Sequence, residues 1–519
     1  MKILLTYISG MPDRKDPYIS LLPTGLCTLQ ACLRAEGHDA VIANFSGWSP
    51  GEIRAKLTGF RPDLAGISIW THNRHASLEL ARLIRDALPG CTILAGGAHA
   101  SFSSGDILSG DGPVDAVVIG EGELTLREIV SRIDLGADWR SVPGIAVMAG
   151  GAVTVTETRP LITDLDRLPS GADYLEHSIG VDIPLQAEFI ITARGCPSAC
   201  HFCSSPRFWG RKVRFRSPEA IVAEIASIRS RYGLIYFSLR DDTFTANRSR
   251  TIDFCRRLID SRLSVLWNCQ SRVTALDEEL AVWMKRAGCE CIQLGVESGS
   301  PDILARLGKK ITPEQVIRAA DIIRKVGMNL SVFLISDVPG ETDDDLRRTI
   351  ELVRRIRPDD GYVSPLAYFP GTAIYDAAVA DGHARSDLFV SSPETALYAA
   401  GRPGNASRRL LRQLSSGSRN EGEERFQDQK RLLGFCATTS ILAGEYYRQR
   451  QQYREAMAEF REITEQEPDN PWGWYLLAEL HNEAGSRGKA AECYRRVLDI
   501  VPGHGPSLRA VAAKKKRGS

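Results

Sequence analysis

The sequence lacks the features that mark a protein for a membrane, for nucleic acid or for export. Its 519 residues have a net charge of +1, which removes any global electrostatic attraction to nucleic acid or to an anionic membrane surface. It has no run of about 20 apolar residues, the length that a membrane-spanning helix needs. The apolar run at 3–7 is too short for a signal peptide and predicts a strand instead. We therefore expect a cytoplasmic protein with no membrane span and no nucleic-acid partner.

A disulfide framework is not expected either, although the chain has 12 cysteines. Thiols stay reduced in a long chain that has no export signal. Most of the nine scattered cysteines lie among apolar residues, where a free cysteine packs as a small hydrophobic side chain. These nine are Cys27, Cys32, Cys91, Cys255, Cys269, Cys289, Cys291, Cys436 and Cys493. The other three lie within one short segment.

Composition and length indicate several globular domains in series. Apolar residues make up 43% of the chain and charged residues 25%, which excludes wholesale disorder. Residues 1–150 alternate short apolar runs with helical patterns, which predicts an α/β domain with a doubly wound, Rossmann-like parallel sheet. Gly96, Gly97 and Gly120 follow predicted strands, where either a tight turn or the close approach of a ligand would require glycine. Both explanations stand at this point.

The middle of the chain predicts a second α/β domain. Residues 151–185 show little periodicity and predict a linker. From 186 to 380 the alternation resumes with six βα units, which favours a partial parallel barrel over a full eightfold barrel of about 250 residues. Residues 381–437 are poorly periodic and predict an irregular extension.

The C-terminal part contains a repeat with a period of 34 residues. Five pairs keep this spacing: Gly444 and Ala478, Ala456 and Ala490, Phe460 and Tyr494, Ile463 and Val497, and Pro468 and Pro502. The period predicts a pair of tetratricopeptide-like helical repeats over 438–503, followed by a basic tail at 504–519. Two repeats bury too little surface to be stable alone. We therefore expect them to dock on a neighbouring part of the chain, on a second copy or on a protein partner.

Three cysteines at C-x3-C-x2-C spacing follow the first predicted strand of the second domain. Cys196, Cys200 and Cys203 lie on one loop opened by glycine and proline, so their thiolates can converge on one face of an iron–sulfur cluster. A [4Fe-4S] cluster normally takes four cysteines, so one iron would stay open to another ligand. A ferredoxin-type cluster completed by a distant cysteine and a zinc site are the alternatives, although zinc favours paired C-x2-C knuckles. His201 lies inside the loop and is not expected to be a ligand.

This motif at the start of a partial barrel resembles the radical S-adenosylmethionine (SAM) superfamily. The resemblance implies that Cys196, Cys200 and Cys203 hold a [4Fe-4S] cluster whose open iron binds the amino and carboxylate groups of SAM. It also implies that one electron from the cluster cleaves SAM to a 5′-deoxyadenosyl radical. Asp337 stands where the family usually has glycine, in the turn after the fifth strand. The implied SAM contacts are Phe202, Asp241, Asp242, Glu297, Ser298 and Gly340, and no catalytic residue is assigned.

The first domain resembles the cobalamin-binding domain that is fused to one large radical SAM subfamily, the cobalamin-dependent radical methylases. The implied cobalamin contacts are Gly25, Ser68, Gly96, Gly97, Gly120 and Glu121. Cobalamin domains often carry a D-x-H-x-x-G motif whose histidine binds the lower face of cobalt. The sequence has only one D-x-H, at 381–383, and it lies outside this domain. Ser386 stands at the position where the motif requires its glycine. The resemblance therefore implies cobalamin bound without that ligand, and a domain that has lost cobalamin is the alternative.

The leading functional hypothesis is a radical SAM enzyme that methylates an unactivated carbon by way of methylcobalamin and a 5′-deoxyadenosyl radical. The first alternative is a cobalamin-dependent cyclase or rearrangement enzyme without net methylation. The second is a non-catalytic redox or cobalamin sensor that signals through its helical repeats. The substrate class is open between a small molecule, a lipid and a peptide, and the expected reductant is a flavodoxin or a ferredoxin.

Overall fold

The computed structural model describes residues 1–9, 21–109, 112–390, 392–400, 404–417 and 423–517. Parts of the predicted extension and the last two residues of the predicted basic tail lie outside the described residues. The chain folds into two compact units. Unit 1 contains Met1–Ala187, Arg194–Phe215 and Leu366–Arg402, and unit 2 contains Glu188–Ala193, Arg216–Pro365 and Pro403–Ser519. None of the described helices has the length and the apolar character that a membrane crossing requires.

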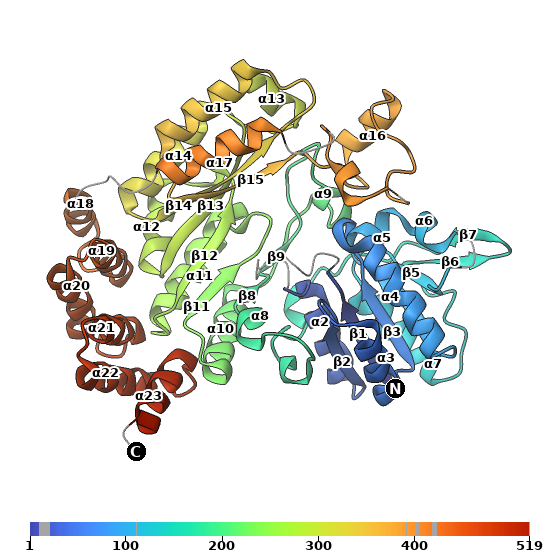
Figure 1. Ribbon diagram of the computed structural model, residues 1–519, viewed down its shortest axis with the longest axis horizontal. Helices are drawn as coiled ribbons and strands as arrows, with labels where there is room; N and C mark the ends of the chain where they lie inside the picture. Colours follow the sequence, from blue (N-terminus) through green and yellow to red (C-terminus); the bar gives the residue numbers. More distant parts are fainter. Residues whose placement is uncertain (10–20, 110–111, 391, 401–403, 418–422, 518–519) are drawn as a thin grey trace. The chain divides into compact units, whose positions relative to one another are not determined.

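Unit 1 is built on a seven-stranded sheet in the order β2-β1-β3-β4-β5-β6-β7. Strands β1 to β5 pair in parallel, and β6 and β7 extend the sheet by antiparallel pairing. Helix α2 contacts α7 and α3 contacts α4, as expected for helix layers on the two faces of the sheet (Figure 1). The doubly wound, Rossmann-like sheet predicted for the first domain is confirmed.

The elements of unit 1 have the following bounds. The strands are β1 (Lys2–Tyr7), β2 (Asp39–Asn44), β3 (Leu64–Ser68), β4 (Thr92–Gly96), β5 (Ala116–Val118), β6 (Ile145–Ala149) and β7 (Ala152–Val155), with β10 (Arg214–Phe215) later in the chain. The longer helices are α2 (Thr24–Ala35), α3 (Pro50–Phe60), α4 (Arg74–Ala87), α7 (Glu123–Asp134) and α16 (Ala373–Ala380). The short ones are η1 (Thr71–Asn73), α5 (Ala98–Phe102), α6 (Ser104–Leu108), η2 (Leu165–Arg167), η3 (Leu175–His177), α8 (Ile183–Ala187), α9 (Ser205–Phe208) and η6 (Glu394–Leu397).

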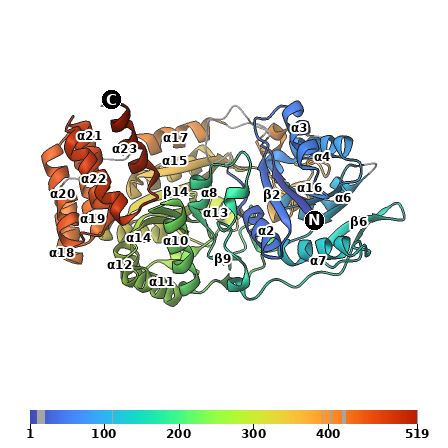
Figure 2. The same ribbon diagram turned by 90° about the horizontal axis from the view of Figure 1, so that it is seen from below.

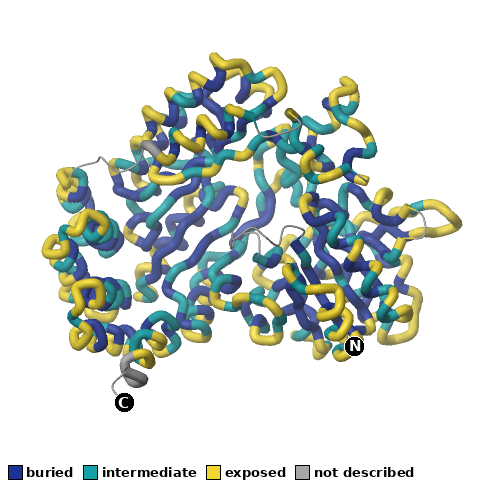
Figure 3. Tube along the Cα trace, in the orientation of Figure 1, coloured by how far each residue is buried: buried dark blue, intermediate teal, exposed yellow. Residues whose placement is uncertain are grey.

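The parallel strands of the sheet in unit 1 are buried on both faces because helices cover them, whereas β7 is largely exposed (Figure 3). All residues of β1 and β2 after the first are buried. Leu4, Phe45 and Ile67 belong to the core beneath the helices. Helix α3 begins at a capping box, in which the Glu52 N–H donates to the Ser49 hydroxyl and the Ser49 N–H donates to the Glu52 carboxylate. Local sequence thus fixes where this helix starts, and apolar packing holds it on the sheet.

Part of the predicted irregular extension folds onto unit 1. Phe389 and Leu397 are buried in a cluster with Tyr368 and Ala378. Arg74, at the start of α4, is buried and donates from Nε to the Phe389 carbonyl oxygen at 3.1 Å. This segment is therefore held by apolar packing and by a buried arginine.

Unit 2 is built on a six-stranded parallel sheet in the order β8-β11-β12-β13-β14-β15. The strands are β8 (Phe189–Ile190), β11 (Tyr236–Leu239), β12 (Leu266–Ser271), β13 (Cys289–Glu297), β14 (Asn329–Ser336) and β15 (Asp360–Pro365), and β9 (Ala193–Arg194) follows β8. Among the described strands, β8 and β15 form the two edges, so the sheet is not closed. The predicted partial (β/α)6 barrel is confirmed.

Helices alternate with these strands. They are α10 (Pro218–Tyr232), η4 (Phe244–Ala246), α11 (Arg248–Asp260), η5 (Val273–Ala275), α12 (Glu278–Arg286), α13 (Pro301–Arg306), α14 (Pro313–Val326) and α15 (Asp343–Ile356). The predicted extension contributes α17 (Asn405–Gly417), which contacts β15 and α15, and α18 (Glu424–Leu433), which contacts α14 and α19. The described part of the extension therefore contains regular helices that pack on unit 2.

The C-terminal helices stack beside one another at one end of unit 2 (Figures 1 and 2). They are α19 (Ala437–Gln449), α20 (Tyr453–Gln466), α21 (Pro471–Glu483), α22 (Arg487–Ile500) and α23 (Gly505–Arg517). A Cβ at Gly444 would lie 2.2 Å from a ring carbon of Phe460, which explains the small residue in the repeat. Phe460 and Ile441 also share a buried cluster with Leu266 of β12. The repeats dock on the barrel, as expected for a pair too small to stand alone.

Candidate cofactor sites

The loop that carries the three-cysteine motif begins at Gly195, between β9 and α9. Gly195 has a φ of +103°, and a Cβ there would lie 2.9 Å from the Lys212 carbonyl oxygen, so only glycine fits. Cys196, Cys200 and Cys203 are partly exposed, whereas seven of the nine scattered cysteines are buried. Three thiols on one accessible loop are a suitable donor set for a cluster with one open iron. Among the described side chains, no three His, Cys, Asp or Glu residues are already arranged as a metal site.

A buried ion-pair network holds the residues on either side of this loop in unit 1. Arg194 donates to Glu121 at 2.8 Å and to Glu123 at 2.5 Å. Arg214 donates to both carboxylate oxygens of Glu121 at 2.8 Å. Burial by itself would lower the pKa of Arg194, but Glu123 and Glu121 outweigh it and raise that pKa. The network joins the cluster loop to the turn after β5.

Glu121 was predicted as a cobalamin contact, and the structure shows what else its carboxylate does. Besides the two arginines, it accepts a hydrogen bond from the Ile162 N–H at 2.8 Å. Its side chain is only 5% exposed. Glu121 thus supports the cluster loop, a role that sequence reasoning missed because its partners lie 73 and 93 residues away.

The other predicted cobalamin contacts lie at the carboxyl ends of the parallel strands, where ligands bind in doubly wound sheets. Ser68 ends β3, Gly96 ends β4, and Gly97 caps α5. A Cβ at Gly97 would lie 3.0 Å from the Ile69 carbonyl oxygen and 3.4 Å from the Ser68 Oγ, so β3 and the turn after β4 are close only because residue 97 is glycine. Gly120 follows β5, and Gly25 is exposed in the first turn of α2. These positions fit a ligand that approaches the backbone.

Two hydrogen-bonded histidines lie at the same end of this sheet, and of the two the sequence pointed only to His99, which follows Gly96 and Gly97 in the loop after the fourth predicted strand. The Tyr7 hydroxyl lies 3.0 Å from the His72 Nε2, and the Thr71 Oγ1 lies 3.1 Å from the His99 Nδ1. Burial, followed by the nearby Arg74 charge, lowers the pKa of His99 to about 3. His99 is therefore neutral near pH 7. The only available signal was their position directly after strands.

Unit 2 places the two predicted acidic SAM contacts of β11 in different surroundings. Asp241 is buried and accepts hydrogen bonds from the Thr192 N–H at 2.6 Å and the Ala193 N–H at 2.9 Å. Burial raises the pKa of Asp241, although Thr192 and Arg250 oppose the shift. Asp242 is exposed. Asp241 holds the chain just before the cluster loop, and Asp242 is the more accessible of the two.

The carboxyl end of β13 contains a strained residue and a buried ion pair. Glu297 ends β13 with a φ of +66°, a conformation that disfavours residues other than glycine. Its carboxylate accepts from the Lys309 Nζ at 2.7 Å, and both side chains are 8% exposed. A Cβ at Gly295 would lie 2.7 Å from that Nζ, so glycine makes room for the pair. Sequence reasoning found Glu297 and missed Lys309.

The remaining predicted SAM contacts have distinct partners. The Ser298 hydroxyl is buried 3.0 Å from the Thr349 Oγ1. Gly340 has a φ of +77° and a Cβ there would meet the Arg306 guanidinium at 2.0 Å. Phe202 lies half-buried in the cluster loop.

Three family models match the chain. The radical SAM superfamily matches residues 190–353, the B12 binding domain matches residues 20–130, and the tetratricopeptide repeat matches residues 447–515. An uncharacterized methyltransferase of Pyrococcus horikoshii is 31% identical over 362 residues, which cover 69% of this chain and 79% of the relative. The chain belongs to the cobalamin-binding radical SAM family.

Two further similarities show the range of this family. The anaerobic magnesium-protoporphyrin IX monomethyl ester cyclase of Rubrivivax gelatinosus is 32% identical over 348 residues, 65% of this chain and 62% of the relative. The radical SAM methyltransferase TsrM of Kitasatospora setae, solved with cobalamin and a [4Fe-4S] cluster, superimposes with a TM-score of 0.63 at 18% identity over 78% of this chain and 85% of that one. This last similarity concerns the fold alone.

Membership in the cobalamin-binding radical SAM family confirms the three predicted cofactors, a [4Fe-4S] cluster, SAM and cobalamin. It favours the cluster over the zinc site for the three cysteines. The assignment as a radical SAM methyltransferase agrees with the radical SAM match and with the Pyrococcus relative, which is named a methyltransferase. The contacts of individual residues with each cofactor remain predictions.

Proposed function

We propose that this enzyme methylates an unactivated carbon of an organic substrate, which is a small molecule, a lipid or a peptide. The observation that supports it is the presence of radical SAM and B12-binding domains on one chain, together with the buried network that ties the cluster loop to the turn after β5. The cluster and SAM supply a hydrogen-abstracting radical when bound, and cobalamin supplies the methyl group.

The residues of the chain bind and orient these groups. Cys196, Cys200 and Cys203 hold the cluster through three of its irons. Arg194 and its two glutamate partners fix the start of the loop from which the three cysteines would hold the cluster. In unit 2, Glu297 is held by Lys309 at the carboxyl end of β13, where the family places a contact with SAM. Precise positioning of this kind is what the protein contributes when the cofactors carry the chemistry.

The radical step is tested with anaerobically reconstituted protein, dithionite and SAM. We expect formation of 5′-deoxyadenosine, measured by mass spectrometry, by the wild type. Cys200→Ala should abolish it, because the cluster loses a ligand. Cys493→Ala, which removes a half-buried cysteine of α22, should leave it unchanged. Absence of 5′-deoxyadenosine from wild-type protein with a full complement of cluster iron would disprove the proposal.

The methyl transfer is tested separately, because the cyclase relative supports a second candidate, a cyclisation or rearrangement without net methylation. SAM with a deuterated methyl group is supplied together with a cell extract. A product that carries the label, with S-adenosylhomocysteine formed alongside 5′-deoxyadenosine, supports methylation. A product that forms with 5′-deoxyadenosine but without label supports the second candidate.

We also propose the partners and location of the enzyme. A flavodoxin or a ferredoxin supplies the electrons, since the cluster must be reduced before it cleaves SAM. The tetratricopeptide match supports a protein partner or self-association through the C-terminal helices. We place the enzyme in the cytoplasm, where cysteines stay reduced and can bind a cluster.

A further inference from the structure

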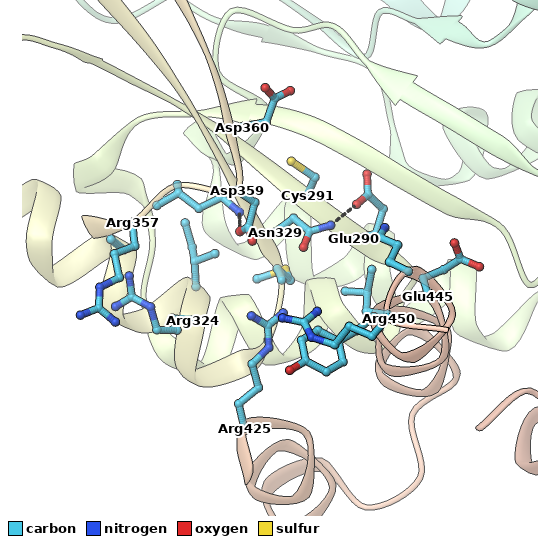
Figure 4. Close-up of a pocket in the computed structure, with 18 residues that line it drawn as sticks. Glu290, Cys291, Arg324, Asn329, Arg357, Asp359, Asp360, Arg425, Glu445 and Arg450 are labelled. Atoms are coloured by element: carbon cyan, nitrogen blue, oxygen red, sulfur yellow. Dashed lines mark hydrogen bonds between the residues drawn. The ribbon is translucent and has the colours of Figure 1, made fainter. Parts of the chain in front are cut away.

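Unit 2 contains a pocket of about 730 Å³ at the amino ends of β13, β14 and β15 (Figure 4). Its lining has four arginines and four carboxylates, so charges of both signs are balanced there. Some of them are partnered within the protein, since Arg324 pairs with Asp321 at 3.0 Å and Glu290 accepts from the Asn329 amide at 3.0 Å. The pocket therefore favours a ligand of neither charge, and the contacts around the cluster loop of unit 1 are more informative.

The cluster loop is held at its middle and beyond its end, in addition to the buried ion pairs at its start. The Ile374 N–H, in the first turn of α16, donates to the His201 carbonyl oxygen at 3.0 Å, between the second and third cysteines of the motif. Arg207 of α9, the helix that follows the loop, pairs with Asp376 of α16 at 2.9 Å. Helix α16 therefore contacts this segment of the chain at two points.

The ring of Phe102, the last residue of α5, packs against both α9 and the turn into α16. Its centroid lies 6.3 Å from that of Phe208 at the end of α9, with the two rings edge to face. A Cβ at Gly371, two residues before α16, would lie 2.6 Å from the Phe102 ring, and Gly371 has a φ of +74°. Only glycine allows this turn to approach the ring so closely. Phe102 thus contacts the two elements that hold the cluster loop.

The aromatic contacts continue from Phe208 to the start of the loop. The ring centroid of Phe208 lies 4.6 Å from that of Trp209. The guanidinium carbon of Arg194, which carries the buried ion pairs, lies 5.2 Å from the centre of the Trp209 ring. Both ends of the cluster loop therefore belong to one packed group of side chains that includes Phe102.

Helix α5 itself begins at the predicted cobalamin contacts. Gly96 ends β4, and Gly97 caps α5. The Gly120 N–H donates to the Ser101 hydroxyl at 3.0 Å, which ties α5 to the turn after β5 as well. A helix of five residues therefore connects three predicted cobalamin contacts with the Phe102 ring.

We propose that Phe102 is a positioning residue that couples cobalamin binding to cluster binding. The coupling rests on the proposed function, in which both cofactors serve one reaction. A ligand at the turns after β4 and β5 restrains α5, and the Phe102 ring then restrains α9 and α16 against the cluster loop. An element that two sites share has to be ordered only once, so the first ligand lowers the cost of binding the second. Because such coupling is reciprocal, each cofactor should bind more tightly when the other is present.

Equilibrium dialysis of the full-length protein against hydroxocobalamin, under anaerobic conditions and without SAM, measures this coupling. For the wild type we expect the Kd with the reconstituted cluster to be about fivefold or more below the Kd without it, as is common for coupled sites. Phe102→Ala should bring the ratio of the two Kd values close to one. Phe102→Leu, which keeps most of the apolar volume and therefore the fold, should give an intermediate ratio. A merely structural role of the ring would weaken both states equally and leave the ratio unchanged.

Phe60→Ala is the matched control. Phe60 is likewise half-buried at the end of a helix of unit 1, and its ring lies 5.8 Å from the Lys2 ammonium. This variant should keep the wild-type ratio. Equal Kd values with and without the cluster in the wild type would overturn the proposal, and so would a wild-type ratio in both Phe102 variants. Since SAM is absent, these outcomes are independent of methylation, whereas a lack of 5′-deoxyadenosine in the earlier assay counts against the proposed function.

Discussion

Glu121→Gln should destabilise unit 1 by about 3 kcal/mol, the lower end of the cost of breaking a buried ion pair. The substitution keeps the size of the side chain but removes the charge that lies 2.8 Å from both Arg194 and Arg214. These arginine side chains are 9% and 7% exposed, so water cannot replace the lost carboxylate. Removal of one partner of such a pair costs about 3–5 kcal/mol. The lower end applies because Arg194 keeps Glu123 at 2.5 Å.

Glu128→Gln is the matched control. Glu128 also binds two arginines, Arg132 and Arg159, but its side chain is 32% exposed. Exposed ion pairs contribute about 0–1 kcal/mol, so this variant should unfold close to the wild type. Urea unfolding of the cobalamin-free protein gives both values, and hydrogen exchange of residues 194–203 shows whether the cluster loop opens. Equal destabilisation by the two variants, or an unchanged loop in Glu121→Gln, would refute the reasoning.

Three further predictions concern other sites. Lys309→Met leaves the buried Glu297 carboxylate without its partner, so this variant should lower both the melting temperature and the affinity for SAM. Lys310→Met, at the exposed neighbouring position, should change neither quantity. Gly444→Ala places a Cβ 2.2 Å from the Phe460 ring and should lower the free energy of unfolding in urea by about 1–3 kcal/mol. A Cβ at Gly488 meets nothing within 4 Å, so Gly488→Ala should leave that free energy unchanged or raise it by about 1 kcal/mol. Burial lowers the pKa of His99 from 6.5 to about 3, so the unfolded state binds more protons between these values. The free energy of unfolding should therefore fall by about 2 kcal/mol from pH 6.5 to pH 5. His99→Gln should make this free energy depend less on pH, as measured by urea unfolding at a series of pH values.

Local patterns in the sequence were enough to predict the parts of the molecule that depend on short spacings. The three cysteines of the cluster loop lie within eight positions, and the small residues of the helical repeat recur at a fixed period. The buried pairs were not predictable, because Glu121 and Arg194 are 73 residues apart and nothing in either segment identifies the partner. The segment around Phe389 was assigned to an irregular extension because its few apolar residues become a core only when they pack with residues from elsewhere in unit 1.

Two residues at the carboxyl ends of the barrel strands combine a strained backbone with a side-chain partner that holds them. Glu297 at the end of β13 and Asp337 after β14 have φ values of +66° and +57°, a conformation that costs roughly 1–2 kcal/mol for residues other than glycine. Each side chain is held, Glu297 by the Lys309 ammonium at 2.7 Å and Asp337 by the Ser407 hydroxyl at 2.7 Å. The side-chain bonds offset the backbone cost, and they also fix the two carboxylates relative to neighbouring strands. Asp337 stands where the family usually has glycine, so a residue that departs from the family pattern still adopts the backbone conformation for which glycine is suited.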